Sequence, residues 1–139
     1  MIEVTEHNVP EQDRRALRRI SRRYSGDPVR SCGSCTACCD MLAIPEHGKP
    51  MNTPCAHSCS SGCAIYAARP DSCQSFKCAW LMGYGKHDDR PDKCGALADY
   101  RHDRLGWKLY GLIFNPGEEA VASLERISLS AGVDVLVVG

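Results

Sequence analysis

The chain has 139 residues, of which 17 are basic and 17 are acidic, so its formal net charge is zero. This length predicts one domain with a modest hydrophobic core. The neutral balance argues against a nucleic-acid-binding protein that depends on overall charge. Residues 1–20 lack the apolar core of a signal peptide, and no apolar run reaches the roughly 18 residues of a membrane span. We therefore expect a cytoplasmic protein without a membrane segment.

The N-terminal part of the chain carries the signals of a helix over 9–24. Asn8 followed three residues later by Glu11 is typical of a helix start, and Gly26 with Pro28 indicates the stop. This helix precedes the cysteine-rich part of the chain.

The predicted helix has a narrow apolar edge and a broad basic surface. Leu17, Ile20 and Tyr24 form a stripe, so we expect the helix to dock by one edge. Its arginines form two rows at a spacing of four residues. A solvated basic face is the favoured interpretation, and the alternative is a surface that docks a protein partner through Arg15, Arg19 and Arg22. Nucleic acid is the less expected partner. The arginines are Arg14, Arg15, Arg18, Arg19, Arg22 and Arg23.

Ten residues of the chain are cysteines, far more than an ordinary intracellular protein carries. Nine of them lie within 31–80, a segment with little hydrophobic periodicity. Such a segment cannot hold itself together by burial alone. In a reducing cytoplasm, clustered cysteines are more often metal ligands than disulfides. The segment is therefore a candidate metal-binding module, within about residues 30–80.

Two short helices are predicted inside this module. The first covers 62–69 and ends at Pro70, because the residue before a proline avoids the helical region. The second runs through 72–82, with Asp71 as its cap. Cys73 then lies in the first turn of a helix, where the helix dipole lowers the pKa of a thiol and favours the thiolate.

The C-terminal part has the pattern of a small sheet with one helix. Residues 94–101 and 106–114 read as two strands of a hairpin with its turn at 102–106. Residues 118–131 have a helical apolar pattern, and 133–138 form a final strand. A β-β-α-β part from residue 94 to the C-terminus packs beside the cysteine module, which predicts an α+β fold.

The spacing of the first four cysteines predicts metal ligation, but the last two are adjacent. Two residues separate Cys32 from Cys35 and Cys35 from Cys38, as in turns that aim sulfur atoms at one ion. Adjacent side chains diverge by about 100° on a helix, so Cys38 and Cys39 are not expected to share one small ion without strain. Either they serve two centres, or only one of them ligates. If 32–39 is helical, its cysteines form a stripe that suits a [4Fe-4S] cluster.

Three further residues have alternative interpretations. Cys94 is expected to be a core residue. His57 is a ligand, a base for a thiol, or a polar loop residue, and we favour the last. Cys59 and His57 are kept as additional metal candidates. The sequence identifies no catalytic residue.

Several of the cysteine motifs, taken together, resemble one bacterial family. They are CGSCTACC from Cys32, the pair Pro54 and Cys55, GCAIYAARPDSCQSF from Gly62, and Cys78. The hallmark of this cysteine-cluster family, regarded as zinc- or iron-chelating, is CxxCxxCC followed by Pro-Cys, Cys-x-Ile-Tyr-x-x-Arg-Pro-x-x-Cys and Phe-x-Cys. The resemblance covers about residues 30–80, and RPDKCGAL from Arg90 resembles the family's continuation.

The resemblance implies thiolate ligands for zinc or iron, with a [4Fe-4S] cluster as the alternative. Cys59 and Cys94 are additional to its pattern. Arg69 and Tyr66 belong to the pattern, and a guanidinium near four thiolates would offset the negative charge of a zinc site. The alternative is that Arg69 caps helix carbonyls and Tyr66 packs in the core. The implied ligands are Cys32, Cys35, Cys38, Cys39, Cys55, Cys63, Cys73 and Cys78.

The first functional hypothesis is a metal-binding protein in which ligation replaces a hydrophobic core. One alternative is an iron-sulfur protein that transfers electrons or supports a protein-modifying enzyme. Another is a metal-scaffolded adaptor that docks a partner through its Arg-rich helix. Larger relatives resemble protein lysine methylases with an iron-sulfur centre, but this chain lacks a Gly-rich nucleotide loop after a strand. Methyl transfer is therefore not expected.

Overall fold

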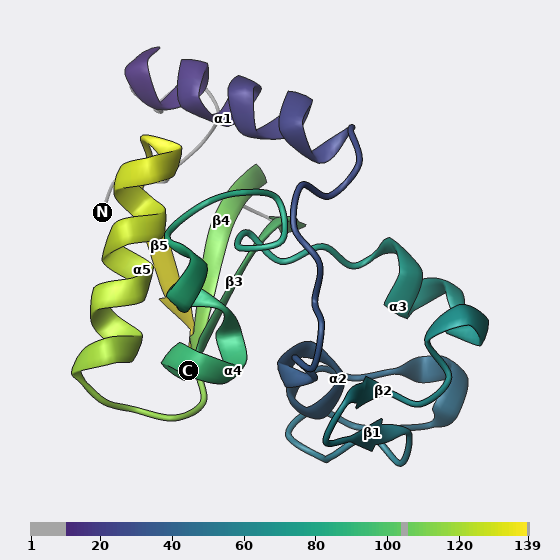
Figure 1. Ribbon diagram of the computed structural model, residues 1–139. Coiled ribbons are helices and arrows are strands. Elements are labelled where there is room, and N and C mark those ends of the chain that lie inside the picture. The colour runs from purple at the N-terminus through teal and green to yellow at the C-terminus, as the bar shows by residue number, and fades with distance from the viewer. Residues whose placement is uncertain (1–10, 104–105, 139) are drawn as a thin grey trace.

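The computed structural model describes residues 11–103 and 106–138, which form an α+β fold of short helices and two small sheets (Figure 1). The predicted fold class is confirmed. No helix in these two ranges is long and apolar enough to cross a bilayer. The larger elements are α1 (Glu11–Tyr24), β3 (Ala96–Asp103), β4 (Gly106–Ile113), α5 (Glu118–Ala131) and β5 (Val135–Val138). The shorter ones are α2 (Ala37–Met41), η2 (Pro45–His47), β1 (Ser58–Cys59), β2 (Gly62–Cys63), η3 (Tyr66–Ala68), α3 (Asp71–Ser75), η4 (His87–Asp89) and α4 (Pro91–Cys94).

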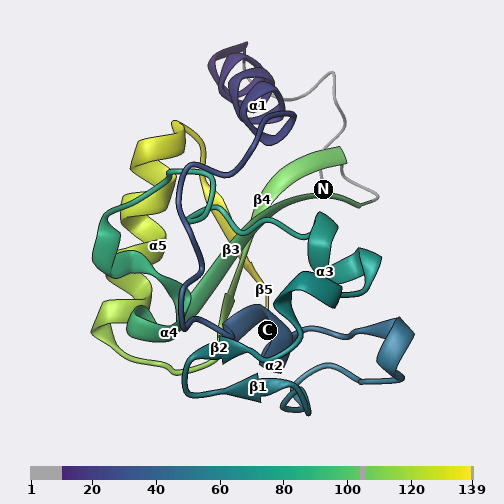
Figure 2. The ribbon, with the colours of Figure 1, turned by 45° about the vertical axis from the view of Figure 1, so that its right-hand side comes forward.

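The larger sheet lies in the centre of the molecule and has the strand order β3-β4-β5. β3 and β4 pair antiparallel, from Ala96 opposite Ile113 to Asp103 opposite Gly106. β5 runs parallel to β4, because α5 connects the end of β4 to the beginning of β5 and returns the chain to the edge of the sheet where β4 begins. α5 lies on one side of this sheet, and the cysteine-rich segment lies on the other side (Figure 2).

The predicted β-β-α-β part is confirmed in its order and almost in its boundaries. The predicted helix 118–131 is α5, and the final strand begins at Val135, two residues later than predicted. The strands of the hairpin extend into the predicted turn 102–106, and residues 104–105 lie outside the described residues.

α1 docks on the sheet by one edge, as its apolar stripe predicts. Ala16 and Ile20 are fully buried, and Leu17 and Tyr24 pack against the same core. Burial of a side chain such as Ile20 contributes about 2 kcal/mol. The helix ends at Tyr24, in agreement with the predicted stop, whereas the predicted cap Asn8 lies outside the described residues.

The two faces of β3 belong to two different apolar clusters. Ala96 and Ala98 pack in the main core with α5. Leu97, which points the opposite way in a strand, packs with Cys78 and Trp80 in a smaller cluster. The sheet therefore joins the helical part of the molecule to the cysteine-rich part.

The predicted helix over 62–69 is wrong in its first half. Gly62 and Cys63 form β2, which pairs with β1, and only Tyr66–Ala68 is helical, as a single 3-10 turn. Gly62 has a φ of 120°, and a Cβ there would lie 2.6 Å from the carbonyl oxygen of Gly33. Only glycine suits both the backbone conformation and the close approach. Strand pairing and this contact outweigh the helical preference of the segment.

The predicted helix over 72–82 is wrong beyond Ser75, where α3 ends. Cys78 instead forms an antiparallel β-bridge with Asp99 at the edge of β3. In a helix, the backbone N–H and C=O groups of Cys78 would bond within the helix and could not pair with β3. The predicted capping role of Asp71 is also wrong. Asp71 is the first residue of α3, so the cap position falls on Pro70, which makes no side-chain hydrogen bond to the helix.

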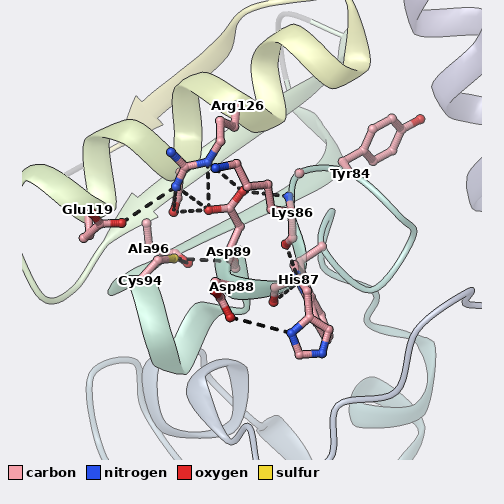
Figure 3. Close-up of polar contacts among 12 residues, drawn as sticks. Tyr84, Lys86, His87, Asp88, Asp89, Cys94, Ala96, Glu119 and Arg126 are labelled. Carbon is pink, nitrogen blue, oxygen red and sulfur yellow. Dashed lines mark hydrogen bonds and ion pairs between the residues drawn. The ribbon is translucent and has the colours of Figure 1, made fainter.

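A buried carboxylate joins the η4 turn to α5 (Figure 3). Asp89 is 1% exposed, and Arg126 of α5 donates to its Oδ1 at 2.6 Å. The hydroxyl of Ser123 and the backbone N–H of Lys86 also donate to this carboxylate, the latter at 2.8 Å. Cys94 is buried beside it, which confirms the prediction of a core residue, although Cys94 ends α4 instead of starting a strand.

We expect Asp89→Ala to lower the free energy of unfolding by about 2 kcal/mol at pH 7, because a buried charged acceptor is lost. Burial raises the pKa of Asp89, but hydrogen bonds from Arg126 and Ser123 outweigh burial and hold this pKa below its ordinary value. The carboxylate therefore stabilises the fold above pH ~4, and its contribution falls as the pH drops through the lowered pKa.

Urea unfolding at several pH values measures this contribution. Asp88→Ala is the matched control, because the side chain of Asp88 is 85% exposed and its ion pairs with His87 and Lys93 contribute little. It should stay within about 0.5 kcal/mol of the unaltered protein. Equal losses in the two variants, or a deficit of Asp89→Ala that grows below pH ~4, would contradict the expectation.

Candidate metal centre

Residues 31–75, called the cysteine lobe below, have almost no hydrophobic core of their own. Within the lobe four residues are buried, namely Ala37, Ile44, Lys49 and Gly62. Most of its cysteines are half-buried and unpaired. Since apolar burial is the main force that orders a chain, these few side chains contribute little to ordering the lobe.

A turn and a short helix bring the first four cysteines together. The backbone N–H of Cys35 donates to the carbonyl oxygen of Cys32 at 2.9 Å. α2 begins only after this turn, so the alternative of a helix through 32–39 is not realised. Cys38 and Cys39 lie on α2 with their Sγ atoms 4.0 Å apart. Both residues line one cavity, and whether they share one ion stays a prediction.

That cavity, of about 80 Å³, lies between α2 and α3. Three cysteines line it, namely Cys38, Cys39 and Cys73, together with Arg69. Its wall is partly apolar, and a cation bound there would interact more strongly with sulfur than it does in bulk water. The other lining residues are Leu42, Ala43, Ile44, Ser72 and Phe76.

Backbone amides point at two other sulfur atoms. The N–H of Leu81 donates to Sγ of Cys78 at 3.4 Å. Sγ of Cys35 accepts from the N–H groups of Ala37 and Asp92. Such donors favour a thiolate, but burial outweighs them and raises the pKa of Cys35 to about 11 and that of Cys78 to about 12. Without a bound cation these two thiols are protonated at neutral pH.

The adjacent pair shares one hydrogen bond, which separates the pKa values of its two thiols. The hydrogen bond to Cys39, followed by burial, raises the pKa of Cys38 far above its ordinary value. The same hydrogen bond lowers the pKa of Cys39 to about 7 against the effect of burial, with help from the charges of Arg69 and Lys49. Cys39 is thus the thiol of the pair that ionises first.

Cys73 lies in the first turn of α3, as predicted, but its pKa is not lowered there. Burial raises this pKa, and the charges of Cys39 and Cys55 raise it further. α3 has five residues, which is too short for a strong helix dipole. The predicted preference for the thiolate is therefore wrong in the protein alone, where burial and then the neighbouring thiols raise the pKa of Cys73.

Asp40, the residue after the adjacent pair, ties the loop of Cys55 to α2. Its carboxylate accepts hydrogen bonds from the N–H of Cys55 at 3.0 Å, from Ser58 Oγ at 2.7 Å and from Thr36 Oγ1 at 2.9 Å. Burial raises the pKa of Asp40, but these hydrogen bonds outweigh it and hold the pKa below its ordinary value. Asp40 is not among the residues predicted from the sequence, where its position directly after CxxCxxCC is the one available signal.

Lys49 places a buried positive charge next to the thiols. Its side chain is 9% exposed, and its Nζ donates to the carbonyl oxygens of Pro50 at 3.0 Å and of Thr53. Its charge lowers the pKa values of Cys39 and Asp40. A buried ammonium costs free energy unless an anion is nearby, and a thiolate group supplies one. Nothing in the local sequence distinguishes this lysine from an ordinary loop residue.

Arg69 caps backbone carbonyls, and its role beside a metal site stays a prediction. It donates to the carbonyl oxygens of Tyr66 at 3.0 Å and of Cys73 at 3.4 Å, so it caps backbone carbonyls. Burial raises the pKa of Cys32, and the charge of Arg69 opposes this shift; the same charge helps to lower the pKa of Cys39. Tyr66 is 55% exposed and stacks on the Arg69 guanidinium at 3.9 Å, so its alternative role as a core residue is wrong.

Two arginines outside the lobe hold its first turn against the sheet part. Arg90 donates to the carboxylate of Asp92 at 2.6 Å and to Ser34 Oγ at 3.2 Å. Arg30 donates to three carbonyl oxygens after β-bridge residue 78, including that of Trp80 at 2.9 Å. The RPDKCGAL motif therefore lies beside the CxxC turn, although more than 50 residues separate Ser34 from Arg90.

The additional candidates lie apart from the cavity between α2 and α3. Cys59 is exposed, and its Sγ contacts Ser61 Oγ at 3.3 Å and the carbonyl oxygen of Gly62 at 3.1 Å. The ring of His57 lies 5.0 Å from that of His47. Neither Cys59 nor His57 is among the residues that line the cavity.

The helix α1, which carries the arginines, lies at the opposite end of the molecule from α2, β1 and β2 of the cysteine lobe (Figure 1). Arg15, Arg19 and Arg22 are exposed, and Arg15 lies 3.5 Å from Glu11. Arg23 stacks on Tyr84 at 4.6 Å. The helix thus presents a basic surface, and its role in docking a partner stays a prediction.

The donor set fits a thiophilic ion in its chemistry. Thiols, amide donors and nearby cations together are the environment that zinc and iron thiolate sites require. Within residues 11–103 and 106–138, no three His, Cys, Asp or Glu side chains already converge closely enough to hold an ion. The side chains would therefore have to converge further on binding, which couples ligation to ordering of the lobe.

No family model matches the chain, and no curated protein or solved structure is significantly similar to it. The resemblance to the bacterial cysteine-cluster family therefore depends on the motifs of residues 30–80 and stays a prediction. The chemistry of the lobe itself is the basis for the proposals that follow.

In metal-free, reduced protein, we expect iodoacetamide to alkylate Cys39 at pH 7 much faster than Cys78. The pKa of Cys39 is lowered to about 7, whereas burial raises that of Cys78 to about 12. Because the thiolate is the nucleophile, the rate at Cys39 should fall about tenfold per pH unit below 7. Peptide mass spectrometry over time measures both rates, and exposed Cys59 is the control for reagent access. Equal rates at Cys39 and Cys78 would contradict the expectation.

Proposed function

We propose that this protein binds zinc or iron through the thiolates of its cysteine lobe, and that ligation orders the lobe on the sheet. One observation carries the proposal: seven half-buried thiols gather in a lobe that has only four buried residues. Thiols in such number and proximity repel each other as anions, and a cation removes this repulsion. The proposed ligands are Cys32, Cys35, Cys38, Cys39, Cys55, Cys63, Cys73 and Cys78.

The residues of the chain have separate roles in this proposal. The amides of Leu81, Ala37 and Asp92 stabilise thiolates at Cys78 and Cys35. Lys49 and Arg69 offset negative charge near Cys39, and Asp40 positions the loop of Cys55. A bound ion supplies cross-links between segments that burial does not connect.

A cytoplasmic location belongs to the same proposal. All ten cysteines are unpaired in the described structure. Clustered unpaired thiols persist in a reducing compartment and become oxidised in a secretory one. Fractionation of cells that express the protein tests the location.

An iron-sulfur centre is the alternative within the same chemistry. Iron-sulfur clusters are held by cysteine thiolates that come from several segments of a chain. The cysteines here also come from several segments, namely the CxxC turn, α2, α3 and the chain before Trp80, and this favours the alternative. Visible absorption and acid-labile sulfide in anaerobically purified protein would establish the cluster. Colourless protein with stoichiometric zinc would exclude it.

We expect chelation of the metal, or Cys35→Ser, to unfold the cysteine lobe while α5 and its sheet stay folded. Trp80 packs in the cluster with Cys78, so its near-UV circular dichroism should report the loss. The matched control is Cys59→Ser, since Cys59 is exposed and lies outside the cavity. Protein that contains no metal and has an unchanged near-UV spectrum would refute the proposal.

Replacement of Lys49 tests the charge balance of the site. We expect Lys49→Met to weaken metal binding roughly 10-fold to 100-fold, the usual effect of losing a group that supports the ligands. Lys49→Arg keeps the charge and should lose less. Competition with a chromophoric chelator measures the affinity, and Lys93→Met is the control because Lys93 is exposed and pairs with Asp88. An unchanged affinity in Lys49→Met would show that the ammonium does not support the site.

A further inference from the structure

A groove of about 640 Å³ lies between α5 and β5, on a part of the molecule that the metal proposal does not use (Figure 1). Its lining is mostly apolar, and four of the apolar side chains are well exposed, namely those of Val121, Leu129, Leu136 and Val137. They are half of the eight large apolar side chains that are exposed in the described residues. Single exposed apolar residues are ordinary, but a gathered group marks an interaction surface.

The strand beside the groove is an open edge of the sheet. The strand order β3-β4-β5 places β5 last, and within the described residues β4 is its only strand partner. Alternate residues of a strand direct their N–H and C=O groups to opposite sides, so half of these groups in Val135–Val138 face away from β4. Proteins usually protect such an edge with a charged residue or a proline, and Val135–Val138 contains neither. The edge is therefore suited to pairing with a further strand.

The charged residues of the groove are acidic. Glu125 of α5 and Asp134, directly before β5, both line the groove and are exposed. No lysine or arginine is among the lining residues in the described part of the chain. A second copy of this protein paired along β5 would bring another Glu125 and another Asp134 to the same interface. A basic segment would instead pair with these carboxylates, so charge complementarity favours a different partner.

We propose that β5 and this groove bind an extended segment of a partner protein that combines apolar residues with lysine or arginine. The segment pairs with the outward backbone groups of β5 as a further strand of the sheet, and its apolar side chains contact Leu129 and Val137. Its cations lie near Glu125 and Asp134. In this mode of binding, main-chain hydrogen bonds provide affinity and side-chain contacts provide specificity. The surface lies outside the cysteine lobe, so this function goes beyond metal binding and does not depend on it.

A display library of short random peptides, panned on the purified full-length protein, tests the proposal. We expect the enriched peptides to alternate apolar with polar residues and to carry lysine or arginine. Binding of a synthetic copy of such a peptide, measured by fluorescence anisotropy, should weaken as the salt concentration rises. The amide NMR signals of Val135–Val138 should shift on binding and should exchange more slowly with solvent.

Two variants test the apolar surface. Val137→Lys places a charge on the strand edge, and Leu129→Lys places one on the helical wall of the groove. We expect each to weaken peptide binding about tenfold or more. Val29→Lys is the matched control, because Val29 is 68% exposed and lies outside the groove. If Val137→Lys fails to fold by far-UV circular dichroism, Leu129→Lys decides, since the side chain of Leu129 is already 84% exposed.

A further variant tests the charge of the groove. We expect Glu125→Gln with Asp134→Asn to lower the affinity roughly threefold to tenfold and to reduce its dependence on salt. Glu118→Gln should change neither quantity, because Glu118 is exposed on α5 but does not line the groove.

Several results would overturn the proposal. They are a panning experiment that enriches no peptide, the enrichment of acidic peptides, and equal binding to the unaltered protein and the two lysine variants of the groove. A dimer in analytical ultracentrifugation that Val137→Lys or Leu129→Lys dissociates would also overturn it, because a second copy would then occupy the groove. None of these outcomes bears on metal binding, which metal analysis of the same protein tests separately.

Discussion

The cysteine lobe depends on one electrostatic constraint: the thiols that the fold holds together cannot all be ionised at once. Cys38 cannot ionise beside Cys39 in the protein alone, and burial keeps Cys35 and Cys78 protonated at neutral pH. As thiolates these groups would repel one another, and a lobe with four buried residues has no apolar core to offset that cost. In the proposed function, the attraction of a bound cation for each thiolate outweighs this repulsion.

The sheet is the platform on which the lobe is built. The main core and the buried Asp89 carboxylate hold β3, α4 and α5 together without any thiol from the lobe. The opposite face of β3 offers Leu97 and a β-bridge to Cys78. One signature cysteine thus belongs to the stable part of the molecule and fixes where the others gather. Under the proposed function, this division is the reason why loss of ligation would disorder the lobe and leave the sheet folded.

Several residues of the candidate site could not be found from local sequence. Three residues that contact or electrostatically influence the cysteines are distant from them in the chain, namely Asp40, Lys49 and Asp92. The largest separation is the 57 residues between Asp92 and Cys35. The failed helix predictions have a similar cause. Residues 62–63 and the chain after Ser75 have helical sequence patterns, but their backbone groups pair with β1 and β3. Local propensity is worth tenths of a kcal/mol per residue, and such pairing outweighs it.

The sequence by itself determined the parts that depend on periodicity and composition. These are the docking edge of α1, the β-β-α-β part, the core position of Cys94 and the concentration of thiols before residue 80. Tertiary structure alone decided which thiols are neighbours and which charges face them. The physical reason is range: a helix or strand pattern repeats within a few residues, whereas the surroundings of a thiol come from segments that only folding brings together.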